Sequence, residues 1–383
     1  MAQRTVRVIM NGVTGRMGYR QHLVRSILPI RADGGVPLPS GDRITVEPIL
    51  VGRNAERLAV LAAQHGVSDY TTDLDDALSD DSALIYFDAQ VTSERKKSIL
   101  KALAAGKHIY TEKPIAESVS EGTELVTAAH EAGVINGVVH DKLYLPGLLK
   151  LKRLIDSGFF GRILSVRGEF GYWVFEGDLL PAQRPSWNYR AEDGGGMVLD
   201  MFPHWNYVLE NLFGRVVAVT AKAVTHIPER WDEQGRKYAA TADDAAYGIF
   251  ELEGDVIAQV NSSWAVRVDR GELVEFQVDG THGSAVAGLF ACRIQPRVRT
   301  PMPVWNPDLP TTEDFRNQWE QIPDNAEFPN GFRAQWEQFL SDVDEGRPHA
   351  YDLAAGVRGL QLVDAGLTSS AEGRRVPIDR SVS

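Results

Sequence analysis

The first third of the chain alternates between short runs of β-branched residues and longer segments in which apolar residues recur at helical spacing. Strands are expected at residues 6–10, 44–51, 83–87, 108–110 and 134–139, and helices at 17–27, 54–64, 93–105 and 119–132. A stretch rich in glycine and proline, residues 31–42, is expected to be an exposed insertion. Parallel strands need a crossover between them, usually a helix, so this alternation predicts an α/β fold with a doubly wound parallel sheet.

The pattern changes after residue 145. A helix is expected at 145–157, strands at 163–172, 216–224, 245–252, 255–263 and 273–279, and two late helices at 332–344 and 352–371. Short turns such as Glu253-Gly254 and Asp279-Gly280 join neighbouring strands, which indicates an antiparallel or mixed sheet. The polar, proline-containing stretch 300–324 is expected to be a loop.

The length of the chain favours two domains, because 383 residues exceed what one hydrophobic core usually holds. We place a dinucleotide-binding domain at residues 1–139, and an α+β substrate and oligomerisation domain at residues 140–383. The two late helices could pack back on the first domain.

Composition excludes several classes of function. A net charge of -12 argues against nucleic acid and against a membrane surface as partners, because phosphates bind to a basic surface. No apolar stretch approaches the roughly 20 residues that a spanning helix needs, and the first residues do not have the pattern of a signal peptide. The single cysteine, Cys292, excludes an intrachain disulfide. We expect a cytoplasmic protein.

A glycine-rich turn, Gly12-Val13-Thr14-Gly15-Arg16-Met17-Gly18, stands directly between the first expected strand and the first expected helix. Glycine permits a tight turn and a close backbone approach, and the free N–H groups at a helix start favour a pyrophosphate. The predicted cofactor contacts are Gly12, Thr14, Gly15, Arg16 and Met17. The spacing GxxGxxG differs from the commoner GxGxxG, and such a turn alone can also be purely structural.

The end of the second expected strand reads Val51-Gly52-Arg53-Asn54, without the acid that NAD enzymes usually place there for the ribose. Arg53 would suit a 2′-phosphate, which slightly favours NADP. It could equally be a solvated charge, and Asn54 could be a helix cap. The cofactor is therefore predicted as NAD or NADP, with Arg53 and Asn54 as contacts.

The segment Glu112-Lys113-Pro114 follows the strand expected at 108–110, whose end points to the sheet edge where ligands bind in such folds. A lysine beside a bound nicotinamide can stabilise an alkoxide or exchange its proton. Lys113 is therefore predicted to be catalytic, and both Lys113 and Glu112 are predicted to contact the cofactor, the alternative being a surface ion pair. The sequence leaves open whether the peptide bond before Pro114 is cis or trans.

Three glycines, Gly194-Gly195-Gly196, precede Asp200 and His204. On a helix this spacing puts the carboxylate and the imidazole on one face. The histidine can exchange a proton near neutral pH, and the carboxylate can set its tautomer or bind a substrate hydroxyl. Pro203 would be best tolerated in the first turn of that helix. No metal site is expected, because the nine histidines are scattered.

Aromatic and basic residues lie just upstream of these glycines. Trp173 and Trp187 could stack on sugar C–H surfaces, and Arg184 and Arg190 could bind an anionic group. The pattern suggests a sugar site whose ligand can carry a carboxylate, sulfonate or phosphate. The alternative is that these residues are core or oligomer contacts.

Through these motifs the chain resembles the Gfo/Idh/MocA oxidoreductases, the relatives of glucose-fructose oxidoreductase and inositol dehydrogenase. The resemblance covers nearly the whole chain, including the stretch 145–166. It implies a Rossmann domain, a C-terminal α+β domain with a large open sheet, and dehydrogenation of a pyranose or cyclitol. It makes Lys113 the catalytic lysine, His204 the histidine at the substrate and Asp200 the carboxylate nearby.

Three departures from the family pattern affect these expectations. The glycine spacing is shifted and the acid after the second strand is missing, which leaves the cofactor choice open. His140-Asp141-Lys142 replaces the usual polar residue after position 139, and we assign His140 and Lys142 to the substrate.

The predicted function is NAD(P)-dependent oxidation of a secondary hydroxyl of a sugar, sugar derivative or cyclitol, or reduction of the ketone. Lys113 and His204 would remove or stabilise the hydroxyl proton while hydride passes to the nicotinamide, around which the separate motifs are expected to meet. A redox glycosidase, which oxidises a glycoside transiently, eliminates the aglycone and reverses the oxidation, would use the same parts. A third hypothesis is a non-catalytic protein that senses nucleotides. Because an open sheet leaves a broad face uncovered, a homodimer or homotetramer is expected.

Overall fold

A computed structural model describes residues 3–299, 308–309 and 315–379. The described chain forms two compact units. The first unit contains the chain up to Tyr144 together with Phe328–Leu360, and the second contains Leu145–Glu327 and Gln361–Asp379. Among the described residues, no helix is both long enough and apolar enough to cross a membrane.

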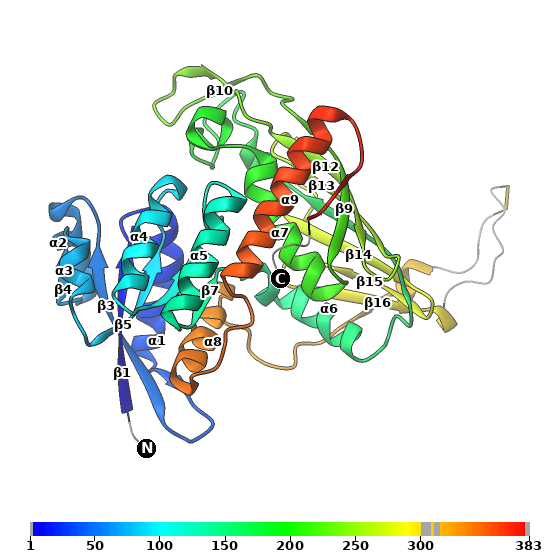
Figure 1. The fold of residues 1–383 in the computed structure, drawn as a ribbon. Coiled ribbons are helices and arrows are strands. Elements are labelled where there is room, and N and C mark those ends of the chain that lie inside the picture. Colours follow the sequence, from blue (N-terminus) through cyan, green and yellow to red (C-terminus); the bar gives the residue numbers. More distant parts are fainter. Residues whose placement is uncertain (1–2, 300–307, 310–314, 380–383) are drawn as a thin grey trace. The chain divides into compact units, whose positions relative to one another are not determined.

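The first unit is built on a mainly parallel sheet (Figure 1). Its strands are β1 (Gln3–Asn11), β2 (Val36–Pro37), β3 (Arg43–Val51), β4 (Asp69–Thr71), β5 (Ala83–Asp88), β6 (His108–Thr111) and β7 (Asn136–Val138). The order is β2-β3-β1-β5-β6-β7, with β4 also on β3, and only β2 runs antiparallel to its neighbour. The predicted doubly wound sheet is therefore confirmed.

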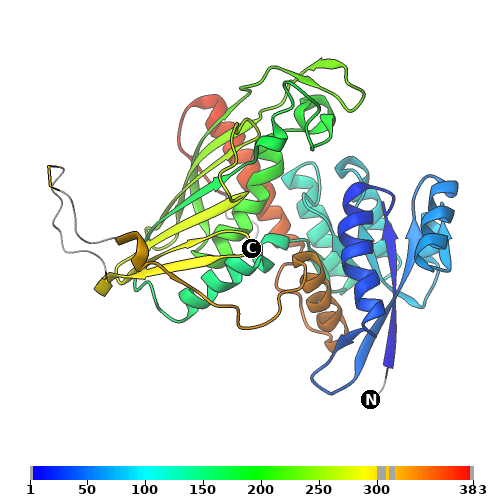
Figure 2. The same cartoon turned by 180° about the vertical axis from the view of Figure 1, so that it is seen from behind.

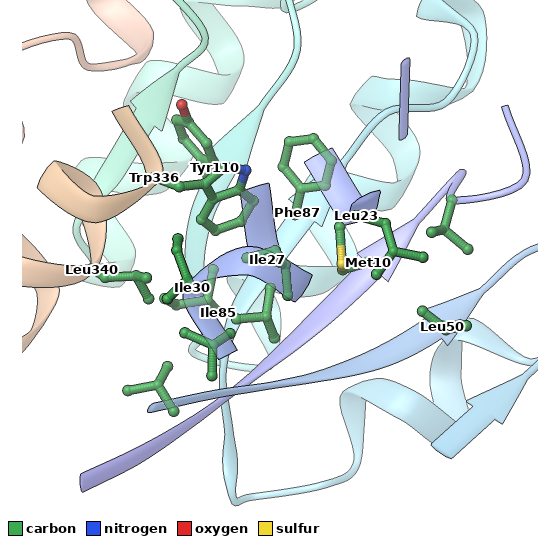
Figure 3. Packing of buried hydrophobic residues seen from close by; sticks show 14 of the residues in the cluster. Met10, Leu23, Ile27, Ile30, Leu50, Ile85, Phe87, Tyr110, Trp336 and Leu340 are labelled. Carbon is green, nitrogen blue, oxygen red and sulfur yellow. The ribbon is translucent and has the colours of Figure 1, made fainter. Parts of the chain in front are cut away.

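Helices cover both faces of this sheet, as the alternation predicts. They are η1 (Gly18–Ile27, a π-helix), α1 (Leu28–Ala32), α2 (Ala55–His65), α3 (Leu74–Leu78), α4 (Thr92–Ala104), α5 (Val119–Ala132), the short η2 (Asp141–Tyr144) and α8 (Gly331–Glu345). One apolar cluster joins the sheet to η1, α2 and α8, and a second joins it to α3, α4 and α5. Figure 3 shows part of the first cluster, with Leu23 of η1 and Trp336 of α8 among its side chains. The sheet is therefore the middle of three layers.

The stretch 31–42 is largely exposed or half-buried, as expected, but part of it forms regular structure. Residues before and within it form α1 and β2, and Val36 is 5% exposed beside the fully buried Ile30. These two apolar side chains add to the core, and β2 pairs with β3. The glycines and prolines therefore shape a short edge strand rather than a free loop.

The second unit is built on a large sheet whose strands are β8 (Ile163–Phe170), β9 (Val216–Val224), β12 (Ala245–Leu252), β13 (Ile257–Ser263), β14 (Val274–Gly280), β15 (Gly283–Ala287), β16 (Cys292–Pro296), β17 (Glu320–Gln321) and β18 (Val376–Pro377). Its order is β17-β16-β15-β14-β8-β13-β12-β9-β18, and only β8 and β13 pair in parallel. A separate hairpin joins β10 (Glu229–Trp231) to β11 (Lys237–Ala239). The sequence had indicated neither this hairpin nor β15 and β16.

Helices cover one face of the large sheet, as the reverse view in Figure 2 shows. They are α6 (Pro146–Asp156), α7 (Met197–Leu212) and the later part of α9 (Leu353–Glu372). Trp205 of α7 packs against Phe170 and Phe276 of the sheet. On the other face Ile249 and Ile257 are 48% and 44% exposed. The expected loop 300–324 lies mostly outside the described residues, since 300–307 and 310–314 are not among them.

Candidate active site

The glycine turn joins β1 to η1, as predicted, and its glycines lie against backbone. A Cβ on Gly12 would lie 2.6 Å from the carbonyl carbon of Ala89, and one on Gly18 would lie 2.6 Å from the carbonyl oxygen of Gly12. Gly12 also has a φ of 82°, which favours glycine. Gly15 and Arg16 are exposed, and Thr14 and Met17 are half-buried. The turn is therefore tight and closely packed, and it ends at the start of a helix, where a pyrophosphate is favoured.

The end of β3 lies beside this turn. The Thr14 side chain lies 3.3 Å from where a Cβ on Gly52 would be. Arg53 is exposed. Asn54 caps α2, because its Oδ1 accepts a hydrogen bond from the backbone N–H of Arg57 at 2.8 Å. The capping role weighed for Asn54 from the sequence is therefore present, and its contact with a cofactor stays a prediction.

Glu112 and Lys113 follow β6 at the carboxyl edge of the parallel sheet, and the Lys113–Pro114 peptide bond is cis. Glu112 is 6% exposed, and its Oε1 accepts a hydrogen bond from His22 at 2.8 Å. Burial would raise the pKa of Glu112, but the hydrogen bond from His22, the electrostatic interaction with His22 and the charges of Lys113 and Arg95 lower it below its ordinary value. Glu112 is thus a buried carboxylate beside Lys113, not half of a surface ion pair.

A buried ion pair lies next to this segment. Asp88, at the end of β5, lies 3.1 Å from the Nε of Arg95, and the two side chains are 0% and 4% exposed. The backbone oxygen of Asp88 accepts the N–H of Glu112 at 2.9 Å, and Arg95 donates to the carbonyl oxygen of Pro114. Burial raises the pKa of Asp88, while the Arg95 charge lowers it. The pair therefore holds the chain on both sides of Lys113.

His140 and Lys142 follow β7 in the first unit. His140 is 3% exposed, and its backbone N–H donates to Gln335 Oε1 at 2.7 Å. Burial, with the charges of His349 and Arg358, holds the pKa of His140 well below its ordinary value. Lys142 Nζ lies 3.8 Å from the carboxylate of its neighbour Asp141. Contact of these two residues with a substrate stays a prediction.

Asp200 and His204 belong to the second unit, on helix α7. Both lie in its first half, and the one-face arrangement follows from their spacing. Pro203 lies inside the helix and beyond its first turn, the position where it would be best tolerated, because α7 already begins at Met197, directly after the triple glycine.

The start of α7 is built from backbone and from a residue far along the chain. A Cβ on Gly195 would lie 2.4 Å from the backbone oxygen of Asn188, and Gly196 has a φ of 135°. With no side chain at Gly196 to cap the helix, Asp243 takes that role: its Oδ2 accepts the N–H of Val198 at 2.8 Å. Burial raises the pKa of Asp243, although the hydrogen bond from Val198 opposes the shift.

Asp200 forms an ion pair with Arg184. The Nη2 of Arg184 lies 2.8 Å from Asp200 Oδ2, and its Nη1 donates to Asn188 Oδ1 at 3.0 Å. The guanidinium also stacks on the ring of Trp264, 4.6 Å from its centroid. The charge of Arg184 is therefore balanced within the protein, which weakens the interpretation that it recognises an anionic ligand.

His204 is 7% exposed, and its Nδ1 lies 2.6 Å from the hydroxyl of Tyr207, a residue that is 1% exposed. From the sequence, Asp200 could set the His204 tautomer or bind a substrate hydroxyl, and this contact makes the Tyr207 hydroxyl a further group that can set the tautomer. A histidine whose Nδ1 is engaged presents Nε2 for proton exchange.

The predicted aromatic platform is partly exposed. Trp173 and Trp187 are 37% and 49% exposed, so neither is a core residue of its unit. Arg190 lies 4.4 Å from the centroid of the Tyr238 ring and 3.6 Å from the carboxylate of Asp193. Sugar stacking and oligomer contacts both remain open for the two tryptophans.

Sequence reasoning missed three residues that hold the predicted ones: His22, Tyr207 and Asp243. Tyr207 follows His204 at helical spacing, which is a usable signal. His22 and Asp243 reach their partners across long separations, so no local pattern indicates them.

Comparison with known proteins agrees with this architecture. Residues 39–140 match the model of the oxidoreductase family with an NAD-binding Rossmann fold, and residues 148–286 match the GFO/IDH/MocA C-terminal domain. A D-xylose dehydrogenase from Paenarthrobacter nicotinovorans is 63% identical over 377 residues, which cover 97% of each chain. The chain belongs to the Gfo/Idh/MocA family of oxidoreductases. The predicted family, fold and activity class, an NAD(P)-dependent sugar oxidoreductase, are confirmed.

More distant relatives share the fold. Levoglucosan dehydrogenase from Pseudarthrobacter phenanthrenivorans is 24% identical over 286 residues, 71% of each chain. The solved structure of a levoglucosan dehydrogenase in complex with NADH has a TM-score of 0.79 at 21% identity, covering 99% of this chain and 100% of that one. Aldose-aldose oxidoreductase from Caulobacter crescentus, complexed with glycerol, has a TM-score of 0.73 at 18% identity, over 98% of this chain and 100% of that one.

Proposed function

We propose that this protein oxidises D-xylose, with a bound nicotinamide dinucleotide as the hydride acceptor. The observation that carries the substrate is the 63% identity to a D-xylose dehydrogenase over 97% of each chain. The glycine turn supports dinucleotide binding, because it leads from β1 directly into the start of helix η1, where a pyrophosphate is favoured.

In the proposed reaction one C–H bond and one O–H bond of a single hydroxyl-bearing carbon break, and a C=O bond forms. The cofactor, when bound, supplies the acceptor for the hydride. The chain supplies the groups for the proton: Lys113 at the edge of the parallel sheet and His204 on α7. Asp200 would bind a sugar hydroxyl through its carboxylate.

The charges near α7 support an uncharged sugar. Arg184 is already paired with Asp200, and Arg190 lies near Asp193. A ligand carboxylate or phosphate would have to compete with these acids for the guanidinium groups. D-Xylose brings no such charge.

The choice between NAD and NADP rests on the end of β3. Arg53 is exposed there and no acid occupies positions 52–54, so we propose that both dinucleotides are accepted, with NADP slightly favoured.

We also propose that the protein is located in the cytoplasm and that it assembles as a homodimer or homotetramer. The assembly is supported by the exposed apolar residues Tyr247, Ile249 and Ile257 on the uncovered face of the large sheet.

The test is formation of NAD(P)H by the purified protein with D-xylose, D-glucose, levoglucosan and scyllo-inositol, each with NAD⁺ and with NADP⁺. We expect the highest kcat/KM with D-xylose and one reduced cofactor per sugar oxidised. Reduction with another member of the panel but none with D-xylose would overturn the substrate assignment.

A xyloside added as a further substrate separates the redox glycosidase from the dehydrogenase. Release of free xylose without matching NAD(P)H formation would support the glycosidase instead. Cofactor binding without turnover on any sugar or glycoside would support the nucleotide sensor.

A further inference from the structure

Three buried side chains, linked by hydrogen bonds, form a series that ends at Glu112. The indole Nε1 of Trp336, on α8, donates to Nδ1 of His22 at 3.0 Å. The Nε2 of the same imidazole lies 2.8 Å from Oε1 of Glu112. His22 lies on η1, directly after the glycine turn. These hydrogen bonds therefore connect that helix to the segment that carries Lys113.

The chemistry of the donors decides where the protons are. An indole N–H can only donate, so Nδ1 of His22 must accept and carries no proton. A neutral imidazole holds its single proton on the other nitrogen, and Nε2–H therefore donates to the carboxylate of Glu112. The arrangement selects one tautomer and excludes the imidazolium.

The surroundings of His22 leave little room for another arrangement. His22 and Trp336 are both 0% exposed. The centroid of the imidazole ring lies 4.3 Å from the ring centroid of Phe87 on β5 and 5.2 Å from that of Phe332 on α8. Figure 3 shows Trp336 beside Phe87 in this aromatic cluster. Glu112 is the charged group that faces His22, and Lys113 and Arg95 act on that carboxylate.

We propose that Trp336 and His22 are positioning residues, which lock the carboxylate of Glu112 beside Lys113 through a neutral, single-tautomer imidazole. The other oxygen of that carboxylate, Oε2, accepts the backbone N–H of Lys113 at 3.2 Å. The lock therefore orients the peptide from which the lysine side chain extends.

The role assigned to Lys113 rests on the proposed function, but the tautomer lock can be tested without substrate. Nitrogen-15 labelling of the histidines reports protonation of each ring nitrogen, and the His22→Gln variant assigns the His22 signals by their absence. We expect Nε2 protonated and Nδ1 unprotonated in the wild type. An imidazolium, or a proton on Nδ1, would overturn the proposal.

The Trp336→Phe variant removes the indole donor and keeps an aromatic ring. Its His22 should exchange between the two neutral tautomers, whereas Trp205→Phe, which removes a buried indole donor to Ser262 in the second unit, should leave the His22 signals unchanged. Unaltered His22 signals in Trp336→Phe would contradict the lock. If that variant does not fold, the wild-type spectra decide alone.

Binding of NADH provides the functional readout. His22→Leu removes the donor to Glu112 and should weaken NADH binding about tenfold, while His22→Gln, whose amide N–H can still donate, should keep most of the affinity. Equal affinity in wild type and His22→Leu would show that the lock does not position the cofactor segment. A failure to oxidise D-xylose would leave all these results unaffected, so the two proposals fail separately.

Discussion

Asp243 offers the sharpest test of how the second unit positions its candidate catalytic helix. Its carboxylate accepts the N–H of Val198, a residue that is 0% exposed, at the start of α7. In Asp243→Ala that N–H loses its acceptor where water cannot replace it, which costs about 1–3 kcal/mol. Loss of the negative charge at the helix start adds roughly 0.3–1 kcal/mol. The backbone bond from Met197 to the Asp243 carbonyl survives any substitution, so α7 should form but fray.

Asp243→Asn is the matched control, because its amide oxygen can still accept the hydrogen bond. This variant loses only the negative charge at the start of α7. Burial already disfavours that charge, and it raises the pKa of Asp243. We expect the asparagine variant to lose less than about 1 kcal/mol. Activity should follow the same order, because Asp200 lies in the first turn of the helix that frays.

Hydrogen exchange of peptides from residues 197–206 measures this locally, which suits a chain of two units better than global unfolding. A loss of about 2 kcal/mol corresponds to roughly 30-fold faster exchange. Wild-type exchange in Asp243→Ala would refute the capping role, and equal effects of both substitutions would show that charge, not the hydrogen bond, matters.

The same carboxyl has a defined pH dependence. Because the pKa of Asp243 is higher in the folded unit than in the unfolded chain, the folded unit binds the proton more tightly. The contribution of this group to stability is thus largest below the ordinary pKa and falls as the pH rises through the raised value. Asp243→Asn should lose this dependence in urea titrations at acidic pH.

Three further predictions concern single side chains. Tyr207→Phe removes the hydroxyl that lies 2.6 Å from His204 Nδ1, and we expect kcat/KM to fall roughly 5- to 100-fold and its pH profile to shift. An unchanged pH profile of kcat/KM would exclude a role of Tyr207 in setting the His204 tautomer. Arg53→Ser should raise KM for NADP⁺ at least about fivefold and leave that for NAD⁺ nearly unchanged, since only the 2′-phosphate loses a cation; equal changes would count against Arg53. His140 has a pKa held low mainly by burial, so the folded protein should lose stability as the pH falls below about 6.5, by up to roughly 1.4 kcal/mol per pH unit. Urea midpoints of His140→Gln should depend less on pH than those of the wild type, and a constant difference between the two would contradict this.

Regular patterning explains how much of the fold could be predicted. The expected strands at 216–224 and 245–252 coincide with β9 and β12, because runs of β-branched and apolar residues mark buried strands. β15, which reads Gly-Ser-Ala-Val-Ala, has mostly small residues and was missed. Its strand conformation depends on pairing with β14 and β16, which is information from outside the segment.

The candidate site divides in the same way. Asp200 and His204 could be placed on one helix from local spacing, and the glycine turn from its position after a strand. The side chains that hold these predicted residues in place could not be predicted from the sequence. Trp336 reaches His22 across 314 residues of sequence, and a carboxylate from residue 243 caps a helix that begins at residue 197. Tertiary contacts of this kind leave no periodic trace in a single sequence.

The most direct test of the proposed function compares single-turnover reduction of the bound cofactor by D-xylose in the wild type, Lys113→Ala and His204→Ala. Cofactor binding should be confirmed in each protein by a separate titration. We predict that both variants retain the cofactor and transfer hydride at least about 100-fold more slowly than the wild type. Transfer at the wild-type rate in both variants would contradict the assignment of these two residues to the chemistry.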